Sequence, residues 1–202
     1  MDPILNIILS TRNPSKAEQI KAIFAGTPFN VLTLTEAGIE GKAVEDGNTL
    51  EENALKKCHY AREHGPKGAW TMSDDTGLFI THLNGQPGIW AARWAGETAS
   101  TEDIMQHTLR KLKGAADRSA TFETVVAIVD SDGKEYLFKG ICEGTLLDAP
   151  RAEPQPEMPY SPLFRPHGSD KVWAEMETDE ENAVSHRGKA FRAARAWLET
   201  QT

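Results

Sequence analysis

The sequence predicts an α/β protein whose β-sheet is elongated and mixed and is flanked by helices. Apolar runs typical of strands alternate with capped, amphipathic stretches typical of helices. Two long strand candidates, residues 120–129 and 135–146, are joined by Asp130-Ser131-Asp132-Gly133, which is typical of a hairpin turn. The 202 residues include 39% hydrophobic side chains, sufficient for one buried core. We therefore expect a single domain over residues 1–202.

The first elements follow local signals. Residues 4–9 are apolar apart from one asparagine and predict the first strand. Asn13 is a good N-cap and Pro14 a good first helical residue, so a helix is expected from there to Gly26. Residues 29–34 are the second strand candidate.

The next helices are predicted in the same way. Thr49 and Glu52 have the spacing of a capping box, and Gly65 marks the end of the helix that they start. Apolar side chains at helical spacing predict another helix over residues 101–112.

The C-terminal part changes composition. Six of the eleven prolines fall within residues 150–166, which predicts an irregular loop. After this loop, Ser185 is a plausible N-cap for an amphipathic final helix.

Two adjacent acids, Asp74 and Asp75, lie within residues 70–80. The apolar residues on either side predict two short strands, with the acids at or near the break between them. Neighbouring like charges repel, and a divalent cation is the usual counter-charge. Oxygen ligands suit magnesium or manganese. An ordinary turn is the alternative, because Asp, Thr and Gly are also common turn residues.

Three other segments carry charge, and two of them do so in patterns that suit an anion. The strand-to-helix turn at residues 11–16 offers a helix N-terminus and Lys16 to phosphate, although, taken alone, this turn favours a capped helix with a surface lysine. Glu45 lies in an acidic loop that could simply be solvated. His186 and Arg187 begin the last helix, where cations oppose the dipole unless an anionic ligand is present. Alternatively, both side chains face water.

Composition and net charge argue against several classes of protein. The net charge of −8 argues against broad nucleic-acid binding. No run of 18 apolar residues could span a membrane, and no basic region precedes the N-terminal apolar residues as in a secretory signal. Cys58 and Cys142 lie far apart, outside any Cys-x-x-Cys pair, which favours a reducing, cytoplasmic setting.

Five segments in order resemble the inosine triphosphate pyrophosphatase family, whose members hydrolyse deaminated purine nucleotides. They are residues 10–16, 45–54, 73–78, 87–93 and 183–190. The resemblance implies two lobes around a central nucleotide-binding cleft, and usually a homodimer. It also implies hydrolysis of a nucleoside triphosphate such as ITP, dITP or XTP to the monophosphate and pyrophosphate, with Mg²⁺ or alternatively Mn²⁺.

The same resemblance assigns roles to residues. Asp75, with Lys16 and Glu45, would be catalytic, and Glu45, Asp74 and Asp75 would bind the metal. Substrate contacts would come from both ends of the chain and the middle of the predicted sheet: Ser10, Thr11, Arg12, Asn13, Lys16, Thr76, Tyr160, Ser161, Glu181, Ser185, His186 and Arg187.

Two departures from the family pattern fall in the expected base pocket. Ser161 stands where the family has an aspartate, and Glu181 where it usually has a lysine. Glu181 is a hydrogen-bond acceptor and suits an amino group better than an oxo group. We therefore expect a changed or relaxed base preference. The alternatives are a pyrophosphatase for another base and a nucleotide sensor without turnover. The proline-rich loop is a lid or surface loop, or else docks a partner.

Overall fold

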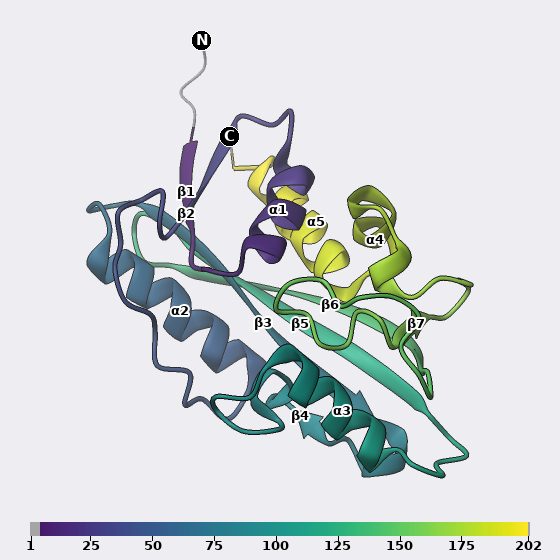
Figure 1. Ribbon diagram of the computed structural model, residues 1–202. Coiled ribbons are helices and arrows are strands. Elements are labelled where there is room, and N and C mark those ends of the chain that lie inside the picture. The colour runs from purple at the N-terminus through teal and green to yellow at the C-terminus, as the bar shows by residue number, and fades with distance from the viewer. Residues whose placement is uncertain (1–4, 202) are drawn as a thin grey trace.

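The computed structural model describes residues 5–201, in which seven strands form one mixed sheet flanked by helices (Figure 1). The strand order is β2-β1-β3-β5-β6-β7, and β4 pairs with β3. The strands are β1 (Leu5–Leu9), β2 (Phe29–Thr33), β3 (Trp70–Ile80), β4 (Pro87–Gly88), β5 (Ser119–Val129), β6 (Glu135–Leu146) and β7 (Phe164–Pro166). β1 runs parallel to β2 and β3, whereas the other pairs are antiparallel. The predicted mixed α/β fold is confirmed; residue 4 of the first predicted strand lies outside the described residues.

Helices cover both faces of the sheet. They are α1 (Pro14–Phe24), α2 (Leu50–His64), α3 (Thr101–Lys111), α4 (Thr178–Val184) and α5 (His186–Leu198), with short 3-10 turns between them. Alternate residues of β5 point to opposite faces. Val125 and Ala127 pack against α2, whereas Val126 and Ile128 pack in the cluster that includes α1 and α5. Figure 1 shows α2 on one side of the sheet and α1 with α5 on the other.

The predicted helix starts are confirmed by their caps. Asn13 accepts a hydrogen bond from the Lys16 amide at 2.9 Å, and Ser185 accepts one from the Gly188 amide at 3.0 Å. Thr49 caps α2, but the reciprocal half of the capping box is displaced by one residue. The Glu52 carboxylate accepts from the Asn48 amide rather than from that of Thr49.

The prediction of two short strands around the acid pair was wrong. β3 is continuous from Trp70 to Ile80, because ten of its residues pair in register with β5, from Thr71 opposite Val129 to Ile80 opposite Ala120. This long pairing overrides the turn propensity of the Asp-Thr-Gly stretch. Adjacent strand residues point to opposite faces, so Asp74 and Asp75 face different sides of the sheet.

Two elements near the C-terminus were also missed. The last residues of the proline-rich segment form β7, which pairs with the end of β6. α4 precedes α5, and acidic side chains in its first turn, including Asp179 and Glu180, complement its dipole. That acidic turn was the signal in the sequence that could have located the helix.

The sheet leaves part of one strand edge open. β1 pairs with β3 only from Trp70 to Met72, after which the chain turns away at Ser10. Between Met72 and Leu78, where β4 begins to pair, β3 has no strand partner on this side among residues 5–201. Side chains from both faces of β3 therefore reach the same space, beyond the carboxyl end of β1. Open α/β sheets commonly bind ligands at this position.

Gly140 on β6 lets α5 approach the sheet closely. A methyl group there would overlap the carbonyl oxygen of His186 and lie 2.6 Å from the Ala190 amide nitrogen. We expect Gly140→Ala to lower the free energy of unfolding by about 2 kcal/mol or more, measured by thermal and denaturant melting. Lys139→Ala, which removes an exposed ion pair with Glu123, is the control and should cost under about 1 kcal/mol. Equal stabilities for the two variants would contradict this packing.

Candidate active site

A cavity of about 530 Å³ lies at the open edge of β3. All of the substrate, catalytic and metal residues predicted from the sequence line it, with the single exception of Ser185, which caps α5 behind it. The cavity is bounded by the turn after β1, the start of α2, the segment before β7 and the α4–α5 junction. Residues separated by up to 177 positions in the chain, from Ser10 to Arg187, thus meet in one pocket.

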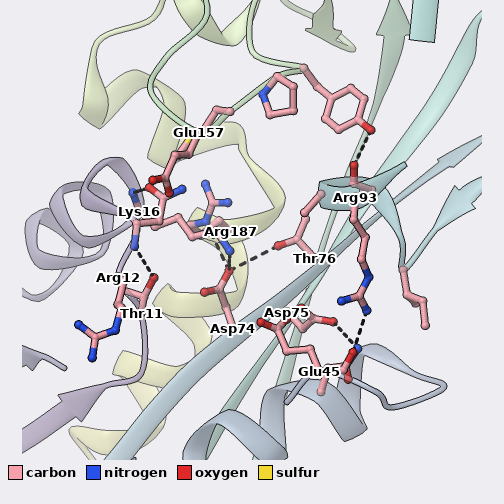
Figure 2. Close-up of a pocket in the computed structure, with 18 of the residues that line it drawn as sticks. Thr11, Arg12, Lys16, Glu45, Asp74, Asp75, Thr76, Arg93, Glu157 and Arg187 are labelled. Carbon is pink, nitrogen blue, oxygen red and sulfur yellow. Dashed lines mark hydrogen bonds and ion pairs between the residues drawn. The ribbon is translucent and has the colours of Figure 1, made fainter. Parts of the chain in front are cut away.

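Asp74 lies on the α1 and α5 side of the sheet, surrounded by cations. Its carboxylate is 3.0 Å from Lys16 Nζ and 3.7 Å from Arg187 Nε, and Thr76 donates to it at 3.4 Å. Figure 2 shows these side chains converging on Asp74. Burial alone would raise the pKa of Asp74, but Lys16, then Arg187 and Lys57, hold it well below its usual range. Asp74 is therefore ionised throughout the neutral range.

Asp75 lies on the α2 side and has a different environment. It accepts hydrogen bonds from Lys57 Nζ at 2.8 Å and from Asn53 Nδ2 at 3.2 Å, and Lys57 also contacts Glu45 at 3.1 Å. Burial raises the pKa of Asp75 above its ordinary value, and Lys57 opposes this rise only in part. Neighbouring carboxylates with diverging pKa values are typical of sites where one holds charge and the other exchanges a proton.

Lys57, Asn53 and Arg93 were not predicted as site residues. Asn53 and Lys57 are one helical turn apart on α2 and face β3, so a polar pair beside the apolar stripe of this helix was the available signal. Arg93 donates to the Glu45 carbonyl at 2.7 Å and so fixes the acidic loop. Only the three-dimensional structure connects Arg93 with Glu45.

Replacing Lys57 is expected to shift the acid limb of the pH–rate profile. Lys57 stabilises the charged form of Asp75, so in Lys57→Met the pKa of Asp75 should rise further. The acid limb of kcat/KM should move to higher pH, by about one unit or more, and activity at neutral pH should fall. Lys56→Met removes an exposed lysine that pairs with Asp46 and is the matched control. Superimposable profiles for Lys57→Met and the unmodified protein would contradict this role.

The turn between β1 and α1 carries the N-terminus of α1, which Asn13 caps, and Lys16 extends from it to Asp74. Arg12 differs from expectation in its contacts: its guanidinium donates to the carbonyls of Ile39 at 2.5 Å and Gly41 at 2.9 Å. Arg12 therefore lines the cavity while tying the turn to the loop after β2.

The end of the cavity near α5, which we call the aromatic end, is lined by Phe122, Trp173, Glu181 and His186. The His186 ring stacks on Phe122, with centroids 4.8 Å apart. The alternative in which His186 and Arg187 face water was wrong, because both are buried. Burial holds the pKa of His186 well below its usual value, so the ring is neutral.

Several polar atoms at the aromatic end have no hydrogen-bond partner within residues 5–201. They include Trp173 Nε1, Arg187 Nε and both ring nitrogens of His186. Buried polar groups are nearly always paired, so unpaired ones on residues that line a cavity are candidates for pairing with a bound ligand. By contrast, Tyr160 donates to the Ala91 carbonyl at 2.8 Å, and the Ser161 hydroxyl donates to Met158 and accepts from Gln155.

The carboxylates do not form a preassembled metal cage. Within the described part of the chain, no group of three or more His, Cys, Asp or Glu side chains is placed to hold a metal ion. Lys16 and Lys57 lie against Asp74 and Asp75, as described above. The acid side chains nevertheless line the same cavity and offer oxygen ligands, as hard divalent cations require.

Comparisons with known proteins find related sequences and a similar fold. A model of the Ham1 family matches residues 7–197. A protein of Caldanaerobacter subterraneus subsp. tengcongensis named dITP/XTP pyrophosphatase is 41% identical over 197 residues, 96% of each chain. One of the same name from Geobacter sulfurreducens is 38% identical over 92% of each chain. The solved Ham1 protein of Staphylococcus aureus superposes with a TM-score of 0.83 at 31% identity, covering 98% of this chain and 100% of that one.

Proposed function

Because this chain belongs to the Ham1 family, we propose that it hydrolyses a purine nucleoside triphosphate of the ITP, dITP or XTP type, with Mg²⁺, to the monophosphate and pyrophosphate. It is a nucleoside triphosphate pyrophosphatase, a hydrolase acting on acid anhydrides. The relatives named for dITP and XTP make these nucleotides the first substrates to test. In this role the protein would remove deaminated nucleotides from the nucleotide pool.

One observation carries the proposal: a lysine, a helix N-terminus and a carboxylate with a raised pKa meet at the open edge of β3. Lys16 and the N-terminus of α1 offer positive charge to the triphosphate. Asp75, with a raised pKa, is the candidate general base. It would take a proton from water as the water oxygen bonds to the α-phosphorus. The bond from that phosphorus to its bridging oxygen then breaks, and pyrophosphate leaves.

The residues present fit magnesium. Mg²⁺ keeps several waters and typically takes one or two carboxylates together with substrate phosphates, so it does not need a preformed protein cage. Glu45, Asp74 and Asp75, which line the cavity, are the candidate ligands. When bound, the ion would neutralise charge that develops on phosphate oxygens. Lys16 and Arg187 would hold the remaining negative charge.

Pyrophosphate release tests the proposal. The panel comprises ITP, XTP, GTP, ATP and the pyrimidine triphosphates, in ribo and deoxy forms, each with Mg²⁺, with Mn²⁺ and with chelator. We expect monophosphate and pyrophosphate in equal amounts, and no product with chelator. Nucleotide binding without any hydrolysis would instead favour the alternative of a sensor. Release of single phosphates would contradict cleavage at the α-phosphorus.

The oligomeric state and the cellular location are part of the same proposal. We propose a cytoplasmic homodimer, testable by light scattering on the purified protein and by fractionation of cells. Among residues 5–201, no helix is both long and apolar enough to cross a membrane.

A further inference from the structure

Glu181, on α4, is a buried carboxylate at the aromatic end of the cavity. It is 2% exposed and lines the cavity wall. Its Oε2 atom accepts from Gln19 Nε2 at 2.8 Å and from Gln155 Nε2 at 3.1 Å. Both donors are neutral amides, and Glu181 has no direct ion pair among the described residues. A carboxylate buried in this way is costly unless further donors satisfy it.

The amide orientations around Glu181 are fixed by their other partners. Gln19 Oε1 accepts from Arg187 Nη1 at 2.7 Å, and arginine can only donate, so the amino side of Gln19 must face Glu181. Gln155 Nε2 lies between the Glu181 carboxylate and the Trp173 carbonyl, at 3.5 Å from the latter, and both of these only accept. Because Gln155 Nε2 faces these two acceptors, Gln155 Oε1 faces away from them. It is buried without a hydrogen-bond partner in residues 5–201.

This arrangement leaves the aromatic end with an unmatched acceptor. Glu181 lines the cavity, and its Oε1 atom makes no hydrogen bond within the described chain. An exocyclic amino group carries N–H donors and can satisfy such an acceptor. A ring carbonyl brought to the same place would set its lone pairs against a carboxylate and leave both unpaired. Sites with buried, unmatched polar groups discriminate strongly between substrates.

We propose that Glu181, supported by Gln155, selects nucleoside triphosphates whose base carries an exocyclic amino group over those, such as ITP and XTP, whose base carries none. This inference rests on the proposed pyrophosphatase activity and changes the preferred substrates of that activity from ITP and XTP to triphosphates with an amino-bearing base. Glu181 is then a specificity residue that contacts the base, and Gln19 is a positioning residue that links it to Arg187. The base preference of this protein would then differ from the preference stated in the name of its relatives, dITP/XTP pyrophosphatase.

Matched substrates test the proposal on the unmodified protein. GTP differs from ITP only by its 2-amino group, whereas ATP differs at position 6 and in the N1 proton. We expect kcat/KM for at least one of them to exceed that for ITP by about tenfold or more. ITP or XTP preferred over both would overturn the inference while leaving the pyrophosphatase activity intact. If no triphosphate is hydrolysed, the proposed function fails, and calorimetric binding of non-hydrolysable analogues reads the base preference independently.

Variants locate the preference at Glu181. The diagnostic quantity is the ratio of kcat/KM for the amino-bearing substrate to kcat/KM for ITP. Glu181→Lys should reverse this ratio in favour of ITP. Glu181→Gln, which keeps the shape but offers donors as well, should bring the ratio close to one. A ratio taken within one variant does not depend on the fraction of protein that is folded. Glu180→Lys makes the same charge change on an exposed neighbour that pairs with Lys171 and should leave the ratio unchanged. A Glu181→Gln ratio equal to that of the unmodified protein would overturn the assignment.

Discussion

Asp75→Asn is expected to lower kcat at least about a hundredfold while the protein remains folded, because the amide cannot take a proton from water. KM should change much less, since Lys16 and the α1 N-terminus still bind the phosphates. Steady-state kinetics with pyrophosphate detection measures the effect. Near-normal turnover would remove Asp75 from the role of base.

The stability of this variant can be argued from the contacts of Asp75. Asparagine keeps an acceptor for Lys57, but its amino group must then face Asn53 Nδ2, another donor. Asn53 cannot easily rotate, because its Oδ1 accepts from the Gly47 amide at 2.8 Å. An opposite effect is favourable: the variant no longer buries the Asp75 carboxylate, and burial of that carboxylate is unfavourable enough to raise its pKa. The two effects oppose, so we expect the free energy of unfolding to change by less than about 2 kcal/mol.

Local features of this fold could be predicted from the sequence. The helix starts depend on a capping side chain and the next three residues, so Asn13 and Ser185 were identified correctly. The hairpin between β5 and β6 likewise depends on a short turn sequence. The residues of the cavity were predicted through their resemblance to a family, because the chain segments that meet there are far apart.

Features that depend on long-range pairing could not be predicted. Whether β3 breaks at the acid pair is decided by its pairing with β5, about 50 residues later. Because the strand continues, Asp74 and Asp75 face opposite sides and each has its own lysine, instead of sharing one counter-ion. The partners of Glu181 illustrate the same limit: Gln19 comes from α1, 162 residues away. No local pattern identifies such a contact.

Asp74→Asn should affect stability far more than Asp75→Asn, although the two acids are neighbours in sequence. The Asp74 carboxylate is 2% exposed, and Lys16 and Arg187 lie 3.0 and 3.7 Å from it. Removing its charge leaves the buried Arg187 and the partly buried Lys16 without this compensation. Breaking one partner of a buried ion pair typically costs about 3–5 kcal/mol. Denaturant melting of both variants measures the contrast, and equal loss of stability would show that Asp74 does not hold these cations.

The pH dependence of stability distinguishes this electrostatic role from simple packing. The folded-state pKa of Asp74 lies well below its ordinary value, so its contribution to stability is fully present above the unfolded pKa of about 4. It is lost as pH falls from there through the folded pKa. The unmodified protein has a higher free energy of unfolding than Asp74→Asn, and this difference should therefore shrink progressively as pH falls below about 4. Lys16→Met offers the converse control, because it removes the cation nearest to Asp74 and should weaken the same acid dependence. A stability difference between Asp74→Asn and the unmodified protein that stays constant from neutral to acid pH would contradict a charge-based role and indicate packing alone.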